Sequence, residues 1–366
     1  MTLTPGCGRP HLAIRVRRTL PDRRSLARRD VRQHAARAGR HPPGSDRPGR
    51  PGARSPHLDV PGAGRARRPA RGIAKGDRVV VQWPDIGEFV EVVFALFRIG
   101  ALPVYALPAH RETETSYFCS FTEAVAYVVP DRHASFDHRN LVARIRERTP
   151  DLRHVFVAGD PGAHTALSEV PCEPSGPFDG PEPHELAFLQ LSGGTTGLNK
   201  LIPRTHDDYM YSLRGSDEIC GVDGDTRFLV ALPAAHNFPL SAPGWLGVLY
   251  AGGTVVLAPK PDPGTAFPLI EAERITMTAL VPPLALVWTE TAPTAEHDLS
   301  SLELTLVGGA KYSEQAARRL EPALGCRLMQ VRHGGGPGRV VRGLSLRPGT
   351  CQEICGRVQP AVGQRE

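Results

Sequence analysis

LQLSGGTTGLNKLIPRTHDDYMYS occupies residues 189–212. A short apolar pattern leads into glycines, hydroxyl side chains and one lysine, and a helical pattern begins near Thr205. A turn between strand and helix holds phosphate in α/β proteins, because glycine lets the backbone approach an anion and lysine adds positive charge. The Walker loop does not fit, since Lys200 comes three places after Gly197. The stretch predicts another kind of phosphate loop, with a plain flexible turn as the alternative.

On both sides of this stretch, from residue 72 to residue 331, apolar strands alternate with helical patterns. Strands are predicted at 77–84, 101–107, 126–130, 154–160, 187–192, 227–233, 254–259, 278–283, 304–310 and 326–331. Helices are predicted between them, at 88–100, 114–124, 140–148, 205–220, 243–251, 266–274, 283–291 and 313–324. This alternation predicts an α/β fold of mostly parallel sheets flanked by helices. Residues 159–184, rich in proline, glycine and acids, are expected to form a surface linker within this domain.

Both ends of the chain differ from this central region. Residues 1–71 contain 18 Arg, four acidic residues and no Lys, Phe, Tyr or Trp, which gives +14, whereas the whole chain carries +6. Residues 332–366 return to Arg, Gly and Pro. Neither segment has enough apolar surface to offset its ordering entropy, so we expect both to be disordered. Three interpretations of such a segment are possible: a nucleic-acid-binding arm, a solvated tail, or out-of-frame translation of GC-rich DNA. We favour the last, a frameshift product, at both ends.

The composition of the central region limits the partners and the location of the protein. Residues 73–331 hold 20 Lys and Arg against 32 Asp and Glu, so nucleic acid is not expected as a partner there. The seven cysteines are scattered and include no CxxC pair, so they indicate neither a disulfide framework nor a zinc site. This usage is typical of a protein in the reducing cytoplasm. No apolar run reaches the roughly 18 residues of a membrane span, so we predict a cytoplasmic protein without a membrane partner.

SGGTTGLNK resembles the phosphate loop of the adenylate-forming superfamily, which includes acyl-CoA synthetases, luciferases and the adenylation domains of peptide synthetases. The stretches LIPRTHDDYMYSLRGSDEIC, ALPAAHNFPLSAPGWLGVLYAGGTVVLAP and LTLVGGAKYSEQAARRL resemble 2,3-dihydroxybenzoate–AMP ligases and their salicylate-specific relatives. Those enzymes load an aryl acid onto a carrier protein for siderophore synthesis. The resemblance covers residues 72–331 and implies the large N-terminal domain of that fold. An acyl- or aryl-CoA ligase of the same superfamily, and a non-enzymatic nucleic-acid binder acting through the basic N-terminus, are the alternatives.

The resemblance implies a role for each matching residue. ATP phosphates would be bound by Ser192, Gly193, Gly194, Thr195, Thr196, Gly197 and Lys200. His236 and Lys200 would be the catalytic residues, near the carboxylate and the phosphates. Gly308, Gly309 and Ala310 would lie against the adenine and the aryl ring. The acid would be bound by Asn237 at its 2-hydroxyl and by Phe238, Ala242, Gly309 and Val331 around its ring.

The sequence departs from the family pattern at a few positions. Ala242 stands where a polar residue is expected, so the choice between dihydroxybenzoate and salicylate stays open. Arg332, His333 and Gly334 stand where the family has the stretch that contains its Mg²⁺-binding glutamate. The sequence also lacks a match to the family's later ribose-binding aspartate and to the small C-terminal domain with its catalytic lysine. We expect ATP and Mg²⁺ as cofactors, no metal ligand in this chain, and impaired activity and solubility. The acyl acceptor would be the phosphopantetheine of an aryl-carrier protein or coenzyme A.

Overall fold

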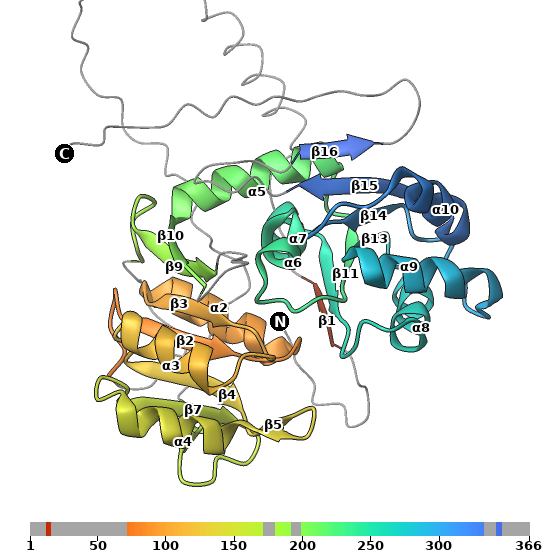
Figure 1. Cartoon of the computed structure of the whole chain (residues 1–366). Helices are drawn as coiled ribbons and strands as arrows, with labels where there is room; N and C mark the ends of the chain where they lie inside the picture. Colours follow the sequence, from red (N-terminus) through yellow and green to blue (C-terminus); the bar gives the residue numbers. More distant parts are fainter. Residues whose placement is uncertain (1–11, 16–71, 171–179, 192–198, 333–341, 346–366) are drawn as a thin grey trace, which may run out of the picture.

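The computed structural model describes residues 12–15, 72–170, 180–191, 199–332 and 342–345. Two seven-stranded sheets organise these residues (Figure 1). Sheet A has the order β1 (Leu12–Arg15), β12 (Thr254–Leu257), β11 (Arg227–Val230), β13 (Met277–Leu280), β14 (Leu304–Val307), β15 (Arg327–Arg332) and β16 (Arg342–Ser345). Sheet B has the order β10 (Leu201–Thr205), β9 (Leu186–Leu191), β3 (Leu102–Ala106), β2 (Arg78–Gln82), β4 (Ala126–Pro130), β7 (His154–Ala158) and β8 (Thr165–Ala166).

Most neighbouring strands in both sheets run parallel. In sheet A the strands from β12 to β15 are parallel, and the edge strands β1 and β16 pair antiparallel. In sheet B the strands from β9 to β8 are parallel, and the edge strand β10 is antiparallel to β9. Parallel strands are covered on both faces, which explains why β3 and β4 are buried along their whole length. The prediction of an α/β fold with mostly parallel sheets is confirmed.

The helices form three layers around the two sheets (Figure 1). Between the sheets, one hydrophobic cluster joins strands of both sheets to α2 (Gly87–Ile99), α5 (His206–Cys220), α6 (Asn237–Ser241) and α7 (Gly244–Ala251). On the other face of sheet A, a second cluster includes α8 (Pro263–Glu273), α9 (Pro282–Thr291) and α10 (Glu314–Leu324). On the other face of sheet B, a third includes α3 (Glu112–Phe121) and α4 (His138–Arg148). Burial of these apolar faces is the main stabilising contribution to the fold.

Local sequence signals set the ends of several helices. Asp137 caps α4 by accepting a hydrogen bond from the backbone N–H of Arg139, and Ser313 caps α10 in the same way. The helix α2 ends at Gly100, whose φ of 71° is a left-handed conformation that glycine adopts without steric cost. Gly100 and Ser313 lie at the ends of the predicted helices 88–100 and 313–324, whereas α4 begins at His138, two residues before its predicted start.

The phosphate-loop region differs from its expected layout. The sequence predicted that the loop after β9 leads directly into a helix, but β10 comes first and pairs antiparallel with β9. The loop at residues 192–200 therefore joins two strands of a hairpin, and α5 begins only at His206. Pro203 lies in β10, which is tolerated because β10 is an edge strand and one side of it needs no ladder hydrogen bonds.

Three other short segments also differ from expectation. Residues 165–170 were predicted to be part of a surface linker, but β8 pairs with β7, and Leu167 and Val170 are buried in the cluster between the sheets. Leu12–Arg15 and Arg342–Ser345 were predicted to be disordered, but they form the edge strands β1 and β16. The remainder of both terminal segments lies outside the described residues.

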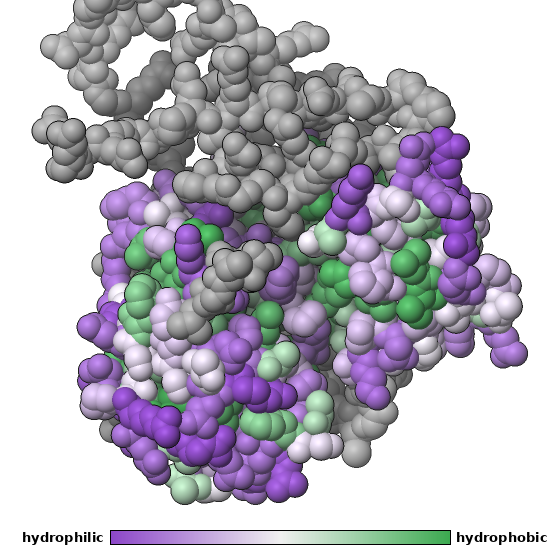
Figure 2. All heavy atoms as spheres, in the orientation of Figure 1, coloured by the Kyte–Doolittle hydropathy of each residue, from purple (hydrophilic) through white to green (hydrophobic). Residues whose placement is uncertain are grey.

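The surface of the described region is largely polar on one side. Figure 2 shows that hydrophilic residues cover much of the visible face of the sheet B half. Large exposed hydrophobic side chains are scattered over several elements and include Phe121, Tyr211, Leu286 and Val287. Within the described residues, no helix has the length and apolar character needed to cross a membrane.

Candidate functional site

The chain that leaves β11 at the carboxyl edge of sheet A is held by groups from the neighbouring layers. The backbone N–H of Ala234 donates to Asp85 Oδ1 at 2.6 Å, and Trp245 Nε1 donates to the Ala234 carbonyl at 3.0 Å. Asp85 follows β2 of sheet B, so this bond connects the carboxyl edges of the two sheets. Burial raises the pKa of Asp85 to about 7, while its bond from Ala234 acts in the opposite direction. Hydrogen bonds thus hold both the N–H and the carbonyl of Ala234, which lies two residues before His236.

His236 is the N-cap of the short helix α6. Its Nδ1 accepts a hydrogen bond from the backbone N–H of Phe238 at 3.2 Å. Although His236 is an exposed residue, the surrounding protein removes part of its hydration and lowers the pKa of the imidazole. Because Nδ1 is the acceptor, the neutral ring carries its proton on Nε2. His236 therefore offers one N–H donor on the side of the ring that faces away from α6.

Asn237 is the first residue of α6 and connects it to sheet B. Gln190, near the end of β9, donates through Nε2 to Asn237 Oδ1. Ser241 Oγ also lies 3.2 Å from Asn237 Oδ1. The Oε1 of Gln190 accepts in turn from Arg204 Nη1 on β10, at 3.4 Å. The predicted acid-binding residue is thus part of a hydrogen-bonded group that joins α6 to sheet B.

Phe238 packs against the glycines that follow β14. Its ring is buried, and a Cβ atom added to Gly308 would lie 2.9 Å from its Cζ. The absence of a side chain at Gly308 therefore makes room for the Phe238 ring. Gly309, with a φ of 88°, and Ala310 are exposed at the same turn. The structure thus brings together His236, Asn237, Phe238 and this turn at one edge of sheet A.

Two further predicted residues of the acid site, Ala242 and Val331, are buried. They belong to the same hydrophobic cluster as Phe238. Ala242 ends α6, and Val331 lies in β15. Neither side chain has a polar atom, so their contribution to a site is shape alone. Their assignment to the aryl ring stays a prediction.

The predicted phosphate loop is only partly described. Ser192, Gly193, Gly194, Thr195, Thr196 and Gly197 lie outside the described residues. Lys200 is exposed immediately before β10. Among the residues that the structure describes, no three or more His, Cys, Asp or Glu side chains gather as a metal site. Mg²⁺ is usually bound through one or two carboxylates together with the phosphates of a nucleotide, so its binding here stays a prediction.

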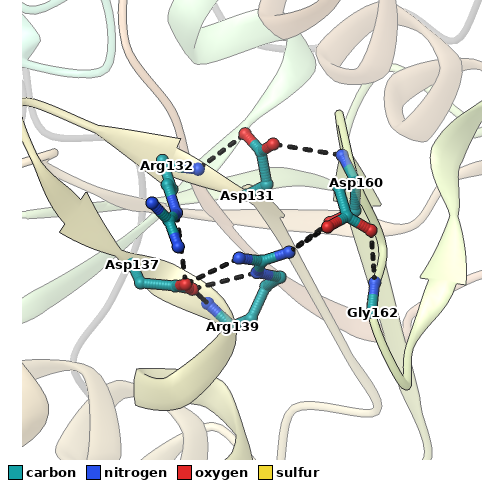
Figure 3. Close-up of polar contacts among 6 residues, drawn as sticks. All are labelled: Asp131, Arg132, Asp137, Arg139, Asp160 and Gly162. Atoms are coloured by element: carbon teal, nitrogen blue, oxygen red, sulfur yellow. Dashed lines mark hydrogen bonds and ion pairs between the residues drawn. The ribbon is translucent and has the colours of Figure 1, made fainter.

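A second polar cluster lies at the carboxyl edge of sheet B, after β4 and β7 (Figure 3). Arg139 forms ion pairs with Asp137 at 2.7 Å and Asp160 at 2.6 Å, and Arg132 lies 3.4 Å from Asp137. The bond from Arg139 holds the pKa of Asp137 well below its usual range. Asp131 accepts from the backbone N–H groups of Arg132 and Asp160. Each charged group in this cluster already has a partner, so the cluster stabilises the edge and is not a candidate site.

Sequence reasoning missed the residues that hold the site in place. Asp85, Gln190, Arg204 and Ser241 each contact the β11–α6 segment or its partners, and none of them was singled out. One signal was available, because Gln190 is a polar residue within the apolar strand LAFLQL. Nothing in the local sequence indicates that its partner lies 47 positions further on, in the short helix α6.

The chain is similar to known proteins over most of its length. A family described as AMP-binding enzyme matches residues 65–341. The chain is 56% identical over 260 residues to a 2,3-dihydroxybenzoate-AMP ligase of Bacillus subtilis, covering 71% of this chain and 48% of that protein. It is 42% identical over 294 residues to a salicyl-AMP ligase / salicyl-S-ArCP synthetase of Mycobacterium tuberculosis, covering 78% and 51%.

A solved structure shows the same fold. The apo structure of MbtA from Mycobacterium smegmatis superposes with a TM-score of 0.69 at 41% identity, covering 77% of this chain and 52% of that chain. The chain thus spans about half the length of the curated relatives that it matches.

Proposed function

Because this chain belongs to the AMP-binding enzyme family, we propose that it serves to activate an aryl acid of the 2-hydroxybenzoate class with ATP. The acid's carboxylate oxygen attacks the α-phosphorus, an acyl–phosphate bond forms, and pyrophosphate leaves. The products are the aryl-adenylate and pyrophosphate. In a second step a thiol attacks the acyl carbonyl, so that a thioester forms and AMP is released. The thiol would be the phosphopantetheine of an aryl-carrier protein, with coenzyme A as the alternative acceptor.

One observation carries this proposal: His236 and Asn237 lie side by side at the carboxyl edge of sheet A, on a segment that both sheets hold in place. Ligands of open α/β sheets bind at this edge. The Nε2–H of a neutral His236 is a suitable donor to an oxygen of the carboxylate or the α-phosphate. An amide at Asn237 is suited to the acid's 2-hydroxyl. The printed names of the relatives, which are aryl-acid–AMP ligases, support this class of acid.

The nucleotide would extend from this edge toward the loop at residues 192–200. Lys200 would supply one positive charge to the phosphates, which suits a reaction that needs charge stabilisation more than a protein nucleophile. The exposed backbone at Gly309 and Ala310 leaves space for a flat ring. ATP is the nucleotide that this chemistry requires. Mg²⁺ would accompany the phosphates of ATP, and no step here depends on it.

Calorimetric binding to the full chain tests the proposal. The probe is a stable acyl-sulfamate analogue of salicyl-AMP, because intermediate analogues bind far more tightly than substrates. We expect saturable binding that is at least about tenfold tighter than that of the matching decanoyl analogue. Replacing Asn237 with Leu should weaken aryl binding and leave the decanoyl value unchanged. No binding of the salicyl analogue, or equal binding of both analogues, would contradict the proposal.

A further inference from the structure

A line of hydrogen bonds runs from α5 to α6 through the β9–β10 hairpin. Asp208 on α5 holds Arg204 through an ion pair of 2.6 Å. Arg204 Nη1 donates to Gln190 Oε1 at 3.4 Å, and Gln190 Nε2 donates to Asn237 Oδ1. We call Asp208, Arg204, Gln190 and Asn237 the polar chain. Its central part is well packed, because Gln190 is only 5% exposed and the Arg204 guanidinium lies 5.0 Å above the centre of the Tyr209 ring, whereas Asp208 lies closer to the surface.

The chemistry of arginine gives the polar chain a direction. A guanidinium group has only donors, so the Gln190 atom that faces Arg204 must be the acceptor Oε1. The other end of the Gln190 amide is then Nε2, which is a donor. The Asn237 atom that faces it must in turn be the acceptor Oδ1. Rotating the side-chain amide of Gln190 or of Asn237 by 180° would place two donors against each other within the buried part of the polar chain.

A second contact supports the same orientation of Asn237. Ser241 Oγ lies 3.2 Å from Asn237 Oδ1 and 3.3 Å from the Asn237 carbonyl, so its hydroxyl proton is shared between these two acceptors. With Gln190 and Ser241 both directed at Oδ1, the lone pairs of that atom are used within the protein. The Nδ2 group makes no such bond to another residue of the described part of the chain. Asn237 is therefore oriented to donate.

We propose, building on the function proposed above, that Gln190 is a positioning residue that turns the Asn237 amide so that the site selects aryl acids whose ortho substituent accepts a hydrogen bond. In a 2-hydroxy acid the hydroxyl proton bonds to the neighbouring carboxylate, which leaves the hydroxyl oxygen as an acceptor for Asn237 Nδ2. An ortho amino group directs an N–H toward the same Nδ2 and meets it donor to donor. Gln190 thus determines specificity without contacting the acid.

The test compares three acyl-sulfamate adenylate analogues by calorimetry on the full chain. Their aryl groups carry a 2-hydroxyl, a 2-amino group or no ortho substituent. We expect the unmodified chain to bind the 2-hydroxy analogue at least about tenfold more tightly than the 2-amino analogue. In Gln190→Glu the carboxylate can only accept, so the Asn237 amide turns around and presents Oδ1. The preference should then fall at least about tenfold or reverse, while the unsubstituted analogue binds as before.

Two further variants make the outcome decisive. Gln315→Glu adds the same charge at an exposed position on α10 and should leave all three affinities unchanged. If Gln190→Glu does not fold, Gln190→Met takes its place in the test. Methionine keeps the volume of glutamine but makes no hydrogen bonds, so the preference for the 2-hydroxy analogue should fall. An unchanged preference in a folded Gln190 variant would overturn this inference alone. Failure of the unmodified chain to bind any of the three analogues would refute the proposed function and the inference with it.

Discussion

Replacing Asp85 with Asn is expected to stabilise the chain at and above neutral pH. Asp85 Oδ1 accepts the backbone N–H of Ala234 at 2.6 Å, and an asparagine Oδ1 can accept the same bond. The difference lies in the charge. Burial raises the pKa of Asp85 from 3.8 to about 7, which means that the folded protein resists its ionisation. An asparagine at this position keeps the contact between the sheets and has no charge to desolvate.

The size of the effect follows from the pKa shift. Each pKa unit corresponds to about 1.4 kcal/mol, so a rise from 3.8 to about 7 corresponds to an upper limit of about 4 kcal/mol. Asp85 keeps some contact with solvent, so we expect about 2 kcal/mol. Because the folded pKa is raised, the carboxyl's contribution to stability is fully present below about pH 4. It is lost as the pH rises through about 7. The gain from asparagine should therefore grow with pH and level off above about pH 7.

Urea unfolding of both proteins at about pH 5 and about pH 8 measures this difference. The free energy of unfolding of Asp85→Asn should exceed that of the unmodified chain by a clearly larger amount at the higher pH. Asp298→Asn is the matched control, because Asp298 is exposed and its hydrogen bonds with Ser300 lower its pKa. It should give no gain that increases with pH. A pH-independent gain for Asp85→Asn, or a loss at about pH 8, would refute the reasoning.

Two further perturbations test other parts of the structure. Burial lowers the pKa of His138 from 6.5 to about 4, so the unfolded chain binds more protons as the pH falls between these values, and the fold should lose roughly 3 kcal/mol over that window. His138→Phe should remove this loss in urea unfolding series, and an unchanged slope would exclude His138 as the cause. Gly308→Ala places a Cβ 2.9 Å from the Phe238 ring and should cost about 1–3 kcal/mol. Adding Phe238→Leu should recover part of that cost in thermal unfolding, whereas additive losses would show that the ring is not the obstacle.

Much of the fold could be predicted from the sequence, because each buried parallel strand carries its own apolar signal. The runs that form β2, β4 and β14 are continuous and apolar, and helical spacing with a terminal Gly100 marks α2. The strand β10 was missed because LIPRT has neither clear alternation nor a long apolar run, and its partner β9 determines its conformation. The assignment of each strand to one of the two sheets, and the strand order within them, was not predicted, since both depend on packing between distant segments.

The candidate site was predictable only in part, for a related reason. His236 and Asn237 follow a predicted strand, at the edge where ligands of parallel sheets bind, but their roles were predicted only from the family resemblance. Gln190 and Asp85 act on this segment from sheet B, and their bonds connect positions that are 47 and 149 residues apart. Periodicity and local propensity contain no information about such pairs. Gln190 and Asp85 could therefore be recognised only from the structure, whereas the edge of the sheet could be predicted from the sequence.

The length of α6 explains why these distant contacts matter. It has five residues, too few for a helix to be stable through its own hydrogen bonds. Contacts with other elements must therefore fix its position. Asp85 bonds the segment before α6, Gln190 bonds its first residue, and Gly308 packs against Phe238. Two of these contacts belong to sheet B and one to sheet A. If Asn237 presents a donor to the acid as proposed, that donor is correctly placed only while the two sheets keep their relative position. The proposed acid site should therefore be sensitive to any change in how the two sheets pack.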